Sequence, residues 1–473
     1  MNTKAKPKAK AKTKTTVKKS ANAPTAMPSE PLTLVVGLGK TGLSCVRHLC
    51  ARGVPVAVTD SRSQPPGLAQ LQADWPEVKV AVGGFDRALF AAATQLVVSP
   101  GVPLTEPLIR RALALGVPAI GDIELFVRET TAPLCAITGS NGKSTVTTLV
   151  GLMAQQAGQR VAVGGNLGEP VLDLLAPNLE RYVIELSSFQ LETVPSLRAD
   201  VAVVLNISAD HLDRYANLDA YAQTKARIYQ GARIAVVNRD DPRVVAMPRA
   251  AEQEIGFTLG EPTGADFGVR VRDGQAWICH GSEPLLPTAE VRIPGRHNLA
   301  NALAALALAH ASAIPLTMAC ETLRTFPGLP HRSEFVAERA GARWYNDSKG
   351  TNPGATLAAL AGLTPESGGG RVVLIAGGEG KGADFSPLRE AVAQSARAVV
   401  LFGRDAPQLA AVLFGTVPLF RARDLHEAVA LAAQQVQPGD CVLLSPACAS
   451  FDLFENYEQR GQVFAEAVRR LRT

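Results

Sequence analysis

The sequence predicts an α/β protein with three domains, each built around a mainly parallel sheet. The chain has 473 residues, which is enough for about three domains of ~150 residues. Short apolar segments alternate with helical or turn-rich segments, a pattern typical of βαβ units. Unusual polar stretches follow these apolar segments, where open parallel sheets bind ligands at the carboxyl ends of their strands. A cleft between two such edges is the expected active site.

The predicted strands fall into three groups along the chain. The first group gives a Rossmann-like domain at residues 30–121, with strands at Leu32–Val36, Pro55–Thr59, Val78–Val82 and Gln95–Val98. The second group gives a P-loop mononucleotide-binding domain at residues 122–328, with strands at Leu134–Thr138, Val161–Val163, Tyr182–Leu186 and Val201–Leu205, and a helix at Asn298–Ala311. The third group gives a Rossmann-like domain at residues 329–473, with strands near Arg343–Tyr345, Arg371–Ile375, Ala398–Phe402 and Cys441–Leu444.

Residues 1–29 form a basic tail that carries eight lysines and no acidic residue. Without those eight charges the net charge of +5 becomes −3, so the body of the chain does not indicate a nucleic-acid partner. The composition of the tail predicts a disordered, solvated segment, and an arm for an anionic surface is the alternative. No apolar segment follows the tail as in a secretory signal.

The cysteines and the apolar segments indicate a cytoplasmic protein that does not enter a membrane. The seven cysteines are scattered and never form a Cys-x-x-Cys pair, which argues against disulfides and against a zinc or iron–sulfur site. The most apolar run, residues 299–316, is interrupted by Asn301 and His310 and reads as a buried helix. We expect a monomer.

Lysine is scarce outside the tail. Only six lysines remain there against 34 arginines, at positions 40, 79, 143, 225, 349 and 381. Lysines that persist in so arginine-rich a chain are candidates for roles that a planar guanidinium cannot fill.

The strongest local signal is the segment Thr138-Gly-Ser-Asn-Gly-Lys-Ser-Thr145 between a predicted strand and a predicted helix. Backbone N–H groups of such a loop bind phosphate, Lys143 would neutralise its charge, and the Ser144 hydroxyl can ligate Mg²⁺. Ile137 stands where the usual motif has its first glycine, and a tight turn before a capped helix is the alternative.

A second glycine-rich loop, Gly37-Leu-Gly-Lys-Thr-Gly42, follows the first strand. With Asp60 after the next strand, it matches a dinucleotide-binding fingerprint. The pattern is weak without a hydride-transfer site, so a tight turn with no ligand is the alternative.

Lys225 is unusual because it lies on the apolar face of a predicted helix, with residues 218, 221, 222, 228 and 229. A lysine there is unfavourable unless it is paired, neutralised or modified. A side chain that snorkels to a carboxylate at the helix edge is the alternative.

Glu185 and His211 each follow a predicted strand of the phosphate-loop domain. They are candidate Mg²⁺ ligands beside the nucleotide, although histidine is an unusual ligand for this ion. Either could instead be a hydrogen-bonded structural residue.

Together these motifs resemble the Mur ligase family. The resemblance extends from about residue 32 to the end and rests on the phosphate loop, Glu185-Leu-Ser-Ser-Phe-Gln190, Asp210-His-Leu-Asp-Arg-Tyr215, His297-Asn298, His331-Arg332 and Asn346-Asp-Ser-Lys349. The short first domain, with Ser99-Pro-Gly101, and the ending Leu444-Ser-Pro-Ala-Cys-Ala-Ser450 narrow it to a glutamate-adding member. The implied reaction is ATP-dependent: the carboxylate of UDP-N-acetylmuramoyl-L-alanine becomes an acyl phosphate, which the amine of D-glutamate attacks.

The resemblance also implies roles for individual residues. The implied catalytic residues are Lys143, Glu185, His211 and Lys225, and the implied Mg²⁺ ligands are Ser144, Glu185, His211 and Lys225, the last as a carbamate. ATP would contact Gly139, Ser140, Asn141, Gly142, Lys143, Ser144, Thr145, Asn298, Asn301, Arg332 and Asp347. The UDP substrate would contact Thr41, Asp60, Ser61, Arg62 and Gly101, with Asn166, Ser187 and Gln190 nearer its muramoyl–alanine end. Glutamate would contact Lys349, Thr351, Lys381, Ser450 and Tyr457.

Two positions depart from the family pattern. Tyr457 replaces a commoner phenylalanine, and Glu379 replaces a commoner aspartate in Gly378-Glu-Gly380.

Three rival functions remain. The main rival is another ligase of this family, acting on a different nucleotide precursor or on folate. A dinucleotide-binding dehydrogenase and a non-enzymatic nucleotide-binding module are the others.

Overall fold

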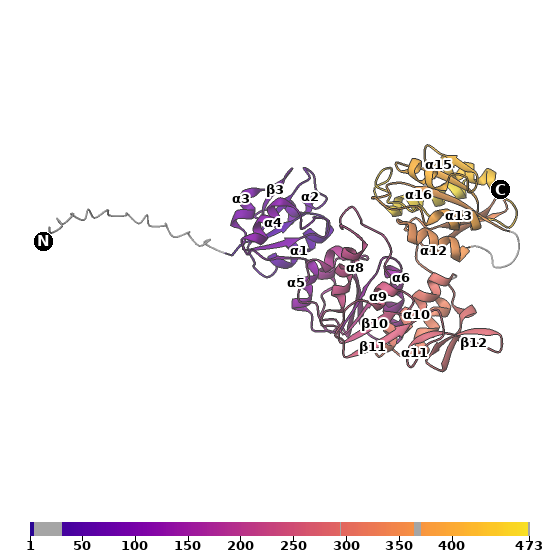
Figure 1. Ribbon diagram of the computed structural model, residues 1–473, viewed down its shortest axis with the longest axis horizontal. Coiled ribbons are helices and arrows are strands. Elements are labelled where there is room, and N and C mark those ends of the chain that lie inside the picture. The colour runs from indigo at the N-terminus through magenta and orange to yellow at the C-terminus, as the bar shows by residue number, and fades with distance from the viewer. Residues whose placement is uncertain (4–30, 294, 364–369, 472–473) are drawn as a thin grey trace.

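The computed structural model describes residues 1–3, 31–293, 295–363 and 370–471. The prediction for the basic tail at residues 1–29 therefore lies outside the described residues, apart from its first three positions. Figure 1 shows the described chain as three α/β bodies, with the third, orange to yellow, above the α10–α11 end of the second. None of the helices in the described ranges is both long and apolar enough to cross a membrane.

The first domain is a five-stranded parallel sheet in the order β3-β2-β1-β4-β5. Its strands are β1 (Thr33–Val36), β2 (Val56–Asp60), β3 (Lys79–Val82), β4 (Gln95–Val98) and β5 (Ala119–Ile120). Its helices are α1 (Lys40–Cys50), α2 (Leu68–Asp74), α3 (Arg87–Ala92) and α4 (Pro107–Ala114). All four residues of β1 are buried, as a central parallel strand requires. The four predicted strands are confirmed, while β5 is too short to produce a sequence pattern.

The central domain has a nine-stranded sheet in the order β14-β13-β12-β11-β10-β9-β6-β8-β7. Its strands are β6 (Leu134–Thr138), β7 (Val161–Gly165), β8 (Arg181–Glu185), β9 (Val201–Val204), β10 (Ile234–Asn238), β11 (Gln253–Phe257), β12 (Phe267–Arg272), β13 (Gln275–His280) and β14 (Glu283–Pro287). Its helices are α5 (Asp122–Glu129), α6 (Lys143–Gln156), α7 (Ser188–Leu191), α8 (Leu218–Ala226), α9 (Pro242–Val245), α10 (Arg296–Ala311) and α11 (Leu316–Thr325).

The last three strands of this sheet are antiparallel to one another and were not predicted. They carry arginine and glutamate on exposed positions, so they lack the continuous apolar run of a buried parallel strand. Asp273 and Gly274 join β12 to β13 and both have positive φ, +52° and +77°. Asp-Gly is a preferred two-residue hairpin turn, so this dipeptide is the feature of the sequence that could have predicted the β12–β13 hairpin.

The third domain is a six-stranded sheet in the order β15-β16-β20-β17-β18-β19, with only β15 antiparallel to its neighbour. Its strands are β15 (Glu334–Arg339), β16 (Ala342–Asn346), β17 (Val372–Gly377), β18 (Ala396–Phe402), β19 (Leu419–Arg421) and β20 (Cys441–Leu444). Its helices are α12 (Pro353–Leu363), α13 (Leu388–Ser395), α14 (Ala406–Leu413), α15 (Leu425–Gln435) and α16 (Tyr457–Arg469). The carboxyl ends of β16 and β20, which are paired through Asn346 and Leu444, bring the polar segments after both strands together.

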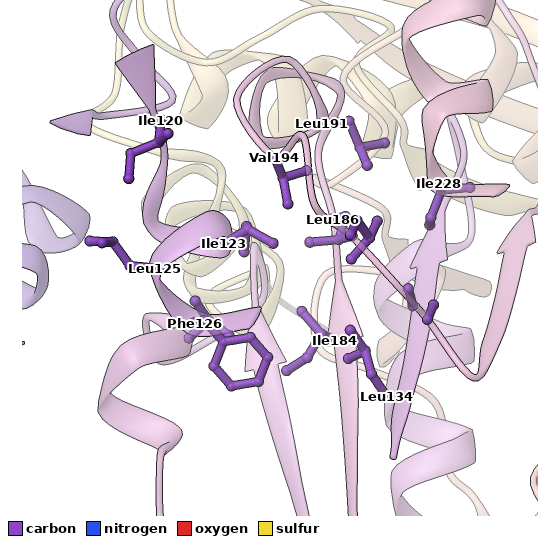
Figure 2. Packing of buried hydrophobic residues seen from close by; sticks show 14 of the residues in the cluster. Ile120, Ile123, Leu125, Phe126, Leu134, Ile184, Leu186, Leu191, Val194 and Ile228 are labelled. Atoms are coloured by element: carbon purple, nitrogen blue, oxygen red, sulfur yellow. The ribbon is translucent and has the colours of Figure 1, made fainter. Parts of the chain in front are cut away.

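The first and central domains share one hydrophobic cluster. It includes Val35 and Val58 of the first sheet together with Leu134 and Ile184 of the central sheet. Figure 2 shows residues from α5 and the central strands in this cluster, with Phe126 beside Ile184 and Leu134. The apolar clusters of the third domain contain only residues of that domain.

Candidate active site

The phosphate loop joins β6 to α6 and depends on two glycines with positive φ. Gly139 has φ +150° and Gly142 has φ +85°. The φ of Gly142 lies in the left-handed region that favours glycine, and an added Cβ atom would also displace the Asn301 side chain, whose Oδ1 would lie 2.3 Å away. The Lys143 ammonium donates hydrogen bonds of 2.9 Å to the carbonyls of Gly139 and Ser140. Desolvation lowers the pKa of Lys143, and the ammonium is therefore poised to gain from an anionic partner.

A cavity of about 320 Å³ opens beside this loop, between the central and third domains. The predicted ATP contacts that line it are Asn141, Gly142, Thr145, Asn298, Asn301, Arg332 and Asp347. Gly139 and Ser140 lie in the loop and Lys143 and Ser144 open α6, all four outside the cavity lining. Arg332 of the third domain donates a 2.9 Å hydrogen bond to Ser144 Oγ, so the two domains meet at the loop.

Other residues of this cavity were missed by the sequence reasoning. Asn238, Phe257 and His297 line its wall. Asn238 and Phe257 end strands β10 and β11, which were not predicted, so their position at the carboxyl edge of the sheet could not be known. His297 belongs to the His297-Asn298 pair of the family resemblance, which by itself implies no role for the histidine.

Asp347 lies on the third-domain side of the cavity and is buried. Burial raises its pKa to about 6, although its carboxylate accepts hydrogen bonds from Ser445 Oγ (2.7 Å) and Ser333 N (3.1 Å).

Asn301 and Asn298 are linked by a 3.3 Å side-chain hydrogen bond on the first turns of α10.

Glu185 ends β8 and is 2% exposed. Its Oε1 accepts a 2.8 Å hydrogen bond from Asn166 Nδ2, while Oε2 is buried without a hydrogen-bond partner among the described residues. A buried carboxylate oxygen without a partner is costly unless a cation or donor satisfies it. Glu185 therefore fits the predicted role of a Mg²⁺ ligand.

His211 has the uncommon backbone φ of +54°, and its ring packs edge-on against Phe189 at 4.8 Å between centroids. Desolvation lowers its pKa to about 4, despite the neighbouring Asp210 carboxylate. The imidazole is therefore neutral near pH 7, and one ring nitrogen keeps a lone pair for a ligand. Within the described chain, no three His, Cys, Asp or Glu side chains converge as a ready-made metal site.

Lys225 lies on α8 and is 1% exposed. Its ammonium donates a 3.2 Å hydrogen bond to Thr138 Oγ1 and lies 4.8 Å from the centroid of the Tyr221 ring. No carboxylate of the described residues lies within ion-pair distance, so the snorkelling alternative is wrong. Burial lowers the pKa of Lys225 well below its usual value and favours the neutral amine.

A second cavity, of about 560 Å³, lies between the first domain and the loop after β7. It is lined by Thr41, Asp60, Ser61, Arg62, Gly101, Asn166 and Gln190, which are seven of the eight predicted UDP-substrate residues. The eighth, Ser187, does not line it and instead caps α7 by accepting a 3.2 Å hydrogen bond from Gln190 N.

The glycine-rich loop of the first domain is a tight turn beside this cavity. A Cβ atom on Gly42 would lie 2.0 Å from the carbonyl oxygen of Gly37. Asp60 accepts hydrogen bonds from the Leu38 N–H (2.7 Å) and from the Arg62 guanidinium (2.7 and 3.0 Å). The turn therefore uses Asp60 to hold its own backbone.

The five predicted glutamate ligands do not share one cavity. Lys349 lines the 320 Å³ cavity, with its ammonium 3.6 Å from the centroid of the Tyr457 ring. Lys381 and Thr351 lie in a separate small pocket that also contains Asp210 and His211. Ser450 is buried after β20 and lines neither.

Asp210 and Asn352 are two polar residues that the sequence reasoning did not assign. Asn352 Nδ2 donates to Asp210 Oδ2 (3.1 Å) and to Asn141 Oδ1 (3.2 Å), which ties the third domain to the phosphate loop. Asp210 opens the motif Asp210–Tyr215 and Asn352 follows the motif Asn346–Lys349, so their position in polar segments after strands was the available signal.

Three family descriptions match consecutive parts of the chain. They are the Mur ligase MurD-like N-terminal domain at residues 32–121, the Mur ligase middle domain at 137–309, and the Mur ligase glutamate ligase domain at 331–448.

Known relatives match almost the whole chain. UDP-N-acetylmuramoylalanine–D-glutamate ligase of Nitrosococcus oceani is 54% identical over 453 residues, covering 94% of this chain and 99% of that protein. The enzyme of the same name from Pseudomonas aeruginosa is 52% identical over 443 residues, covering 94% and 99%. The solved UDP-N-acetylmuramate–alanine ligase of Thermotoga maritima shares the fold with a TM-score of 0.59 at 19% identity, covering 93% and 99%. The chain belongs to the Mur ligase family.

Proposed function

We propose that this chain joins D-glutamate to UDP-N-acetylmuramoyl-L-alanine in peptidoglycan precursor synthesis, and that ATP is converted to ADP and phosphate. One contact carries the proposal: Asn166 lines the first-domain cavity, and its amide holds Glu185 beside the phosphate loop. A substrate bound in the first-domain cavity would therefore extend toward the nucleotide phosphates. The names of the relatives at 52–54% identity support the same reaction.

In the first step, the phosphate loop would bind ATP through its backbone N–H groups, Lys143 and Ser144. The terminal carboxylate of the UDP substrate attacks the γ-phosphorus, the bond to the ADP oxygen breaks, and an acyl phosphate forms. Lys143 neutralises negative charge that grows on the transferred group. Arg332, hydrogen-bonded to Ser144, brings a second positive charge from the third domain.

Mg²⁺, when bound, would balance phosphate charge, with Glu185, His211, Ser144 and a carbamate of Lys225 as its protein ligands. The carbamate forms when the unprotonated Lys225 amine attacks CO₂, making an N–C bond and releasing a proton. Burial favours the unprotonated amine that this reaction needs. The change converts a neutral buried amine into an anion. The attraction between such an anion and a unit positive charge ~4 Å away is worth ~4 kcal/mol at an effective dielectric of ~20.

In the second step, the amine of D-glutamate attacks the acyl carbon, and the tetrahedral intermediate expels phosphate to leave an amide. Lys349, Thr351, Lys381, Ser450 and Tyr457 would hold the glutamate. Lys349 and Lys381 line different pockets. Either each lysine would bind a different carboxylate of the glutamate, or the third domain would move on binding so that both lysines reach the same carboxylate. Removing water from the cleft would protect the acyl phosphate from hydrolysis.

The test is phosphate release by the purified full chain with ATP, Mg²⁺, one acceptor and a panel of amino acids. We expect release only with UDP-N-acetylmuramoyl-L-alanine and D-glutamate together. Release with another amino acid or another precursor would favour a different ligase of this family. A nicotinamide absorbance change without phosphate release would favour a dehydrogenase, and nucleotide binding without turnover would favour a binding module.

We also propose that the enzyme acts as a monomer in the cytoplasm. The seven cysteines are all free and six of them are buried, which suits a reducing compartment. Light scattering of the purified chain, with and without substrates, tests the monomer.

A further inference from the structure

Arg214 of the central domain contacts the first-domain loop that lines the 560 Å³ cavity. Its Nη1 donates a 2.8 Å hydrogen bond to the carbonyl of Pro100, and its Nη2 donates a longer one, 3.4 Å, to the carbonyl of Val102. Pro100, Gly101 and Val102 all belong to the cavity wall. The guanidinium therefore holds the wall of the predicted UDP site from the central domain.

The same residue is three positions from His211. The backbone N–H groups of Arg214 and Tyr215 both donate to the His211 carbonyl, at 3.0 and 3.1 Å. These bonds close a turn in which His211 has a positive φ. Residues 211–215 are thus a short hydrogen-bonded unit, and a shift of Arg214 would be transmitted to the backbone of His211.

A side-chain cluster reinforces this link. The Arg214 guanidinium carbon lies 4.0 Å from the centroid of the Phe189 ring, and the His211 ring packs edge-on against the same ring. Glu192 accepts from Arg214 Nη2 at 2.8 Å and from the Tyr215 hydroxyl at 2.6 Å. The Arg214–Glu192 pair is mostly shielded, with side chains 14% and 16% exposed, so solvent screens it less than an open surface pair.

The planar guanidinium is suited to this position. It donates to two backbone carbonyls and one carboxylate while its face covers an aromatic ring. An ammonium has neither the fixed fork nor the flat face, so lysine would retain charge but not these directions.

We propose that Arg214 is a positioning residue that couples occupancy of the first-domain cavity to the orientation of His211. This inference rests on the proposed function, because it assigns the cavity to the UDP substrate and His211 to the Mg²⁺–nucleotide site. A substrate that orders the Pro100–Val102 loop would fix Arg214, and Arg214 would fix the turn that carries His211. The coupling is reciprocal by linkage, so Mg²⁺–ADP would tighten substrate binding by the same factor.

Isothermal titration calorimetry tests the coupling without turnover. The affinity of UDP-N-acetylmuramoyl-L-alanine is measured with and without Mg²⁺–ADP in the full chain and in Arg214→Lys and Arg214→Met. We expect the wild type to bind the substrate about tenfold more tightly when Mg²⁺–ADP is present. In both variants we expect this factor to fall to about twofold or less, while each ligand alone still binds.

Arg227→Met is the matched control, because Arg227 donates to the backbone carbonyl of Glu192, the residue whose carboxylate pairs with Arg214, but makes no contact with the first domain among the described interactions. It should keep the wild-type coupling factor. Glu192→Gln removes the charged partner of Arg214 and should lower the coupling factor below that of the wild type. This variant decides the matter if the arginine variants do not fold, and an unchanged factor in it would then contradict the inference. Failure of the wild type to couple the two ligands, or coupling that survives in Arg214→Met, overturns the inference.

The outcomes also separate this inference from the proposed function. A wild type that couples both ligands but releases no phosphate with D-glutamate contradicts the proposed function and leaves the coupling intact. A wild type that turns over normally, with Arg214 variants that keep full coupling, contradicts only the role of Arg214. In that second case a lower melting temperature of the variants would identify Arg214 as a purely structural contact between domains.

Discussion

The ammonium of Lys381 in the third domain lies 3.0 Å from Oδ1 of Asp210, the residue before His211 in the central domain. Burial alone would raise the pKa of Asp210, but the Lys381 ammonium and other nearby positive charges outweigh it and the pKa ends below its usual value. A lysine proposed to bind glutamate is therefore already paired with a carboxylate across the domain boundary. A glutamate carboxylate at this position would have to take the place of Asp210.

Lys381→Met should raise the KM for D-glutamate about tenfold or more and change the KM for the UDP substrate much less. The reason is the loss of a charge-assisted hydrogen bond, worth ~1.5–3 kcal/mol. Steady-state kinetics with each substrate varied in turn measures the two values. Lys79→Met, at an exposed lysine of the first domain, is the control and should match the wild type. Equal increases in both KM values, or a selective effect on ATP, would assign Lys381 to phosphate or transition-state binding.

Lys225→Ala and Lys225→Arg should both lose nearly all activity. The alanine variant lacks the proposed anionic ligand, and the arginine variant keeps a positive charge where a negative one is required. Small carboxylic acids should partly restore turnover to Lys225→Ala only. In addition, ¹³C-labelled bicarbonate should give a carbamate resonance in the wild type that is missing from Lys225→Ala. An active arginine variant would show that this residue acts only as a cation.

The KM for D-glutamate should rise as the pH increases through about 8. Burial lowers the pKa of Lys349 from 10.5 to about 8, so the free enzyme loses this positive charge above that pH. Lys349→Arg stays charged and should show a flatter KM profile between about pH 7 and 9.5. The same shift affects stability with the opposite sign: the cost of burying the ammonium is largest below pH 8 and disappears as the pH approaches 10.5. A KM that rises equally in the wild type and in Lys349→Arg would show that titration of the substrate D-glutamate, and not of Lys349, causes the rise.

Gly42→Ala should destabilise the protein by about 3 kcal/mol and abolish binding of the UDP substrate. Its Cβ would lie 2.0 Å from the Gly37 carbonyl oxygen, and backbone cannot move aside as a flexible side chain can. Gly39→Ala in the same loop is the control for stability, since nothing lies within 4 Å of the added Cβ and φ is −89°. Chemical denaturation and calorimetric titration check the two effects. If both variants behave alike, the tight turn is not what the loop requires.

Parallel strands such as β1 and β6 could be predicted because they are buried on both faces and appear as continuous apolar runs, whereas the parallel strands β10 and β11 were missed. The strand Leu134–Thr138, for example, was placed with its final boundaries. Strands such as Phe267–Arg272 were missed because only the first two residues are buried and the exposed end carries arginine. The boundaries between domains at 121/122 and 328/329 remain predictions.

The candidate site was predictable where function requires a local pattern and less so where folding brings distant segments together. The phosphate loop and Lys225 stood out within single segments. Ser187-Ser-Phe-Gln190 is a local capping box, so the capping role of Ser187 could have been predicted from the sequence. The separation of Lys349 from Lys381 and the partnership of Asp210 with Lys381 depend on how distant segments of the chain meet. Local sequence carries no direct record of those contacts.

The shared apolar cluster of the first and central domains has a thermodynamic consequence. Val35 and Val97 of one sheet are buried with Leu134 and Ile184 of the other, whereas the third domain meets the central domain through polar contacts such as Asn352–Asn141 and Arg332–Ser144. Two domains that bury one core lose it together when either melts, while polar contacts give way independently. Scanning calorimetry of the ligand-free enzyme should therefore resolve two cooperative units, a large one containing the first two domains and a smaller one containing the third. Ligands that bridge the cleft would merge them into one.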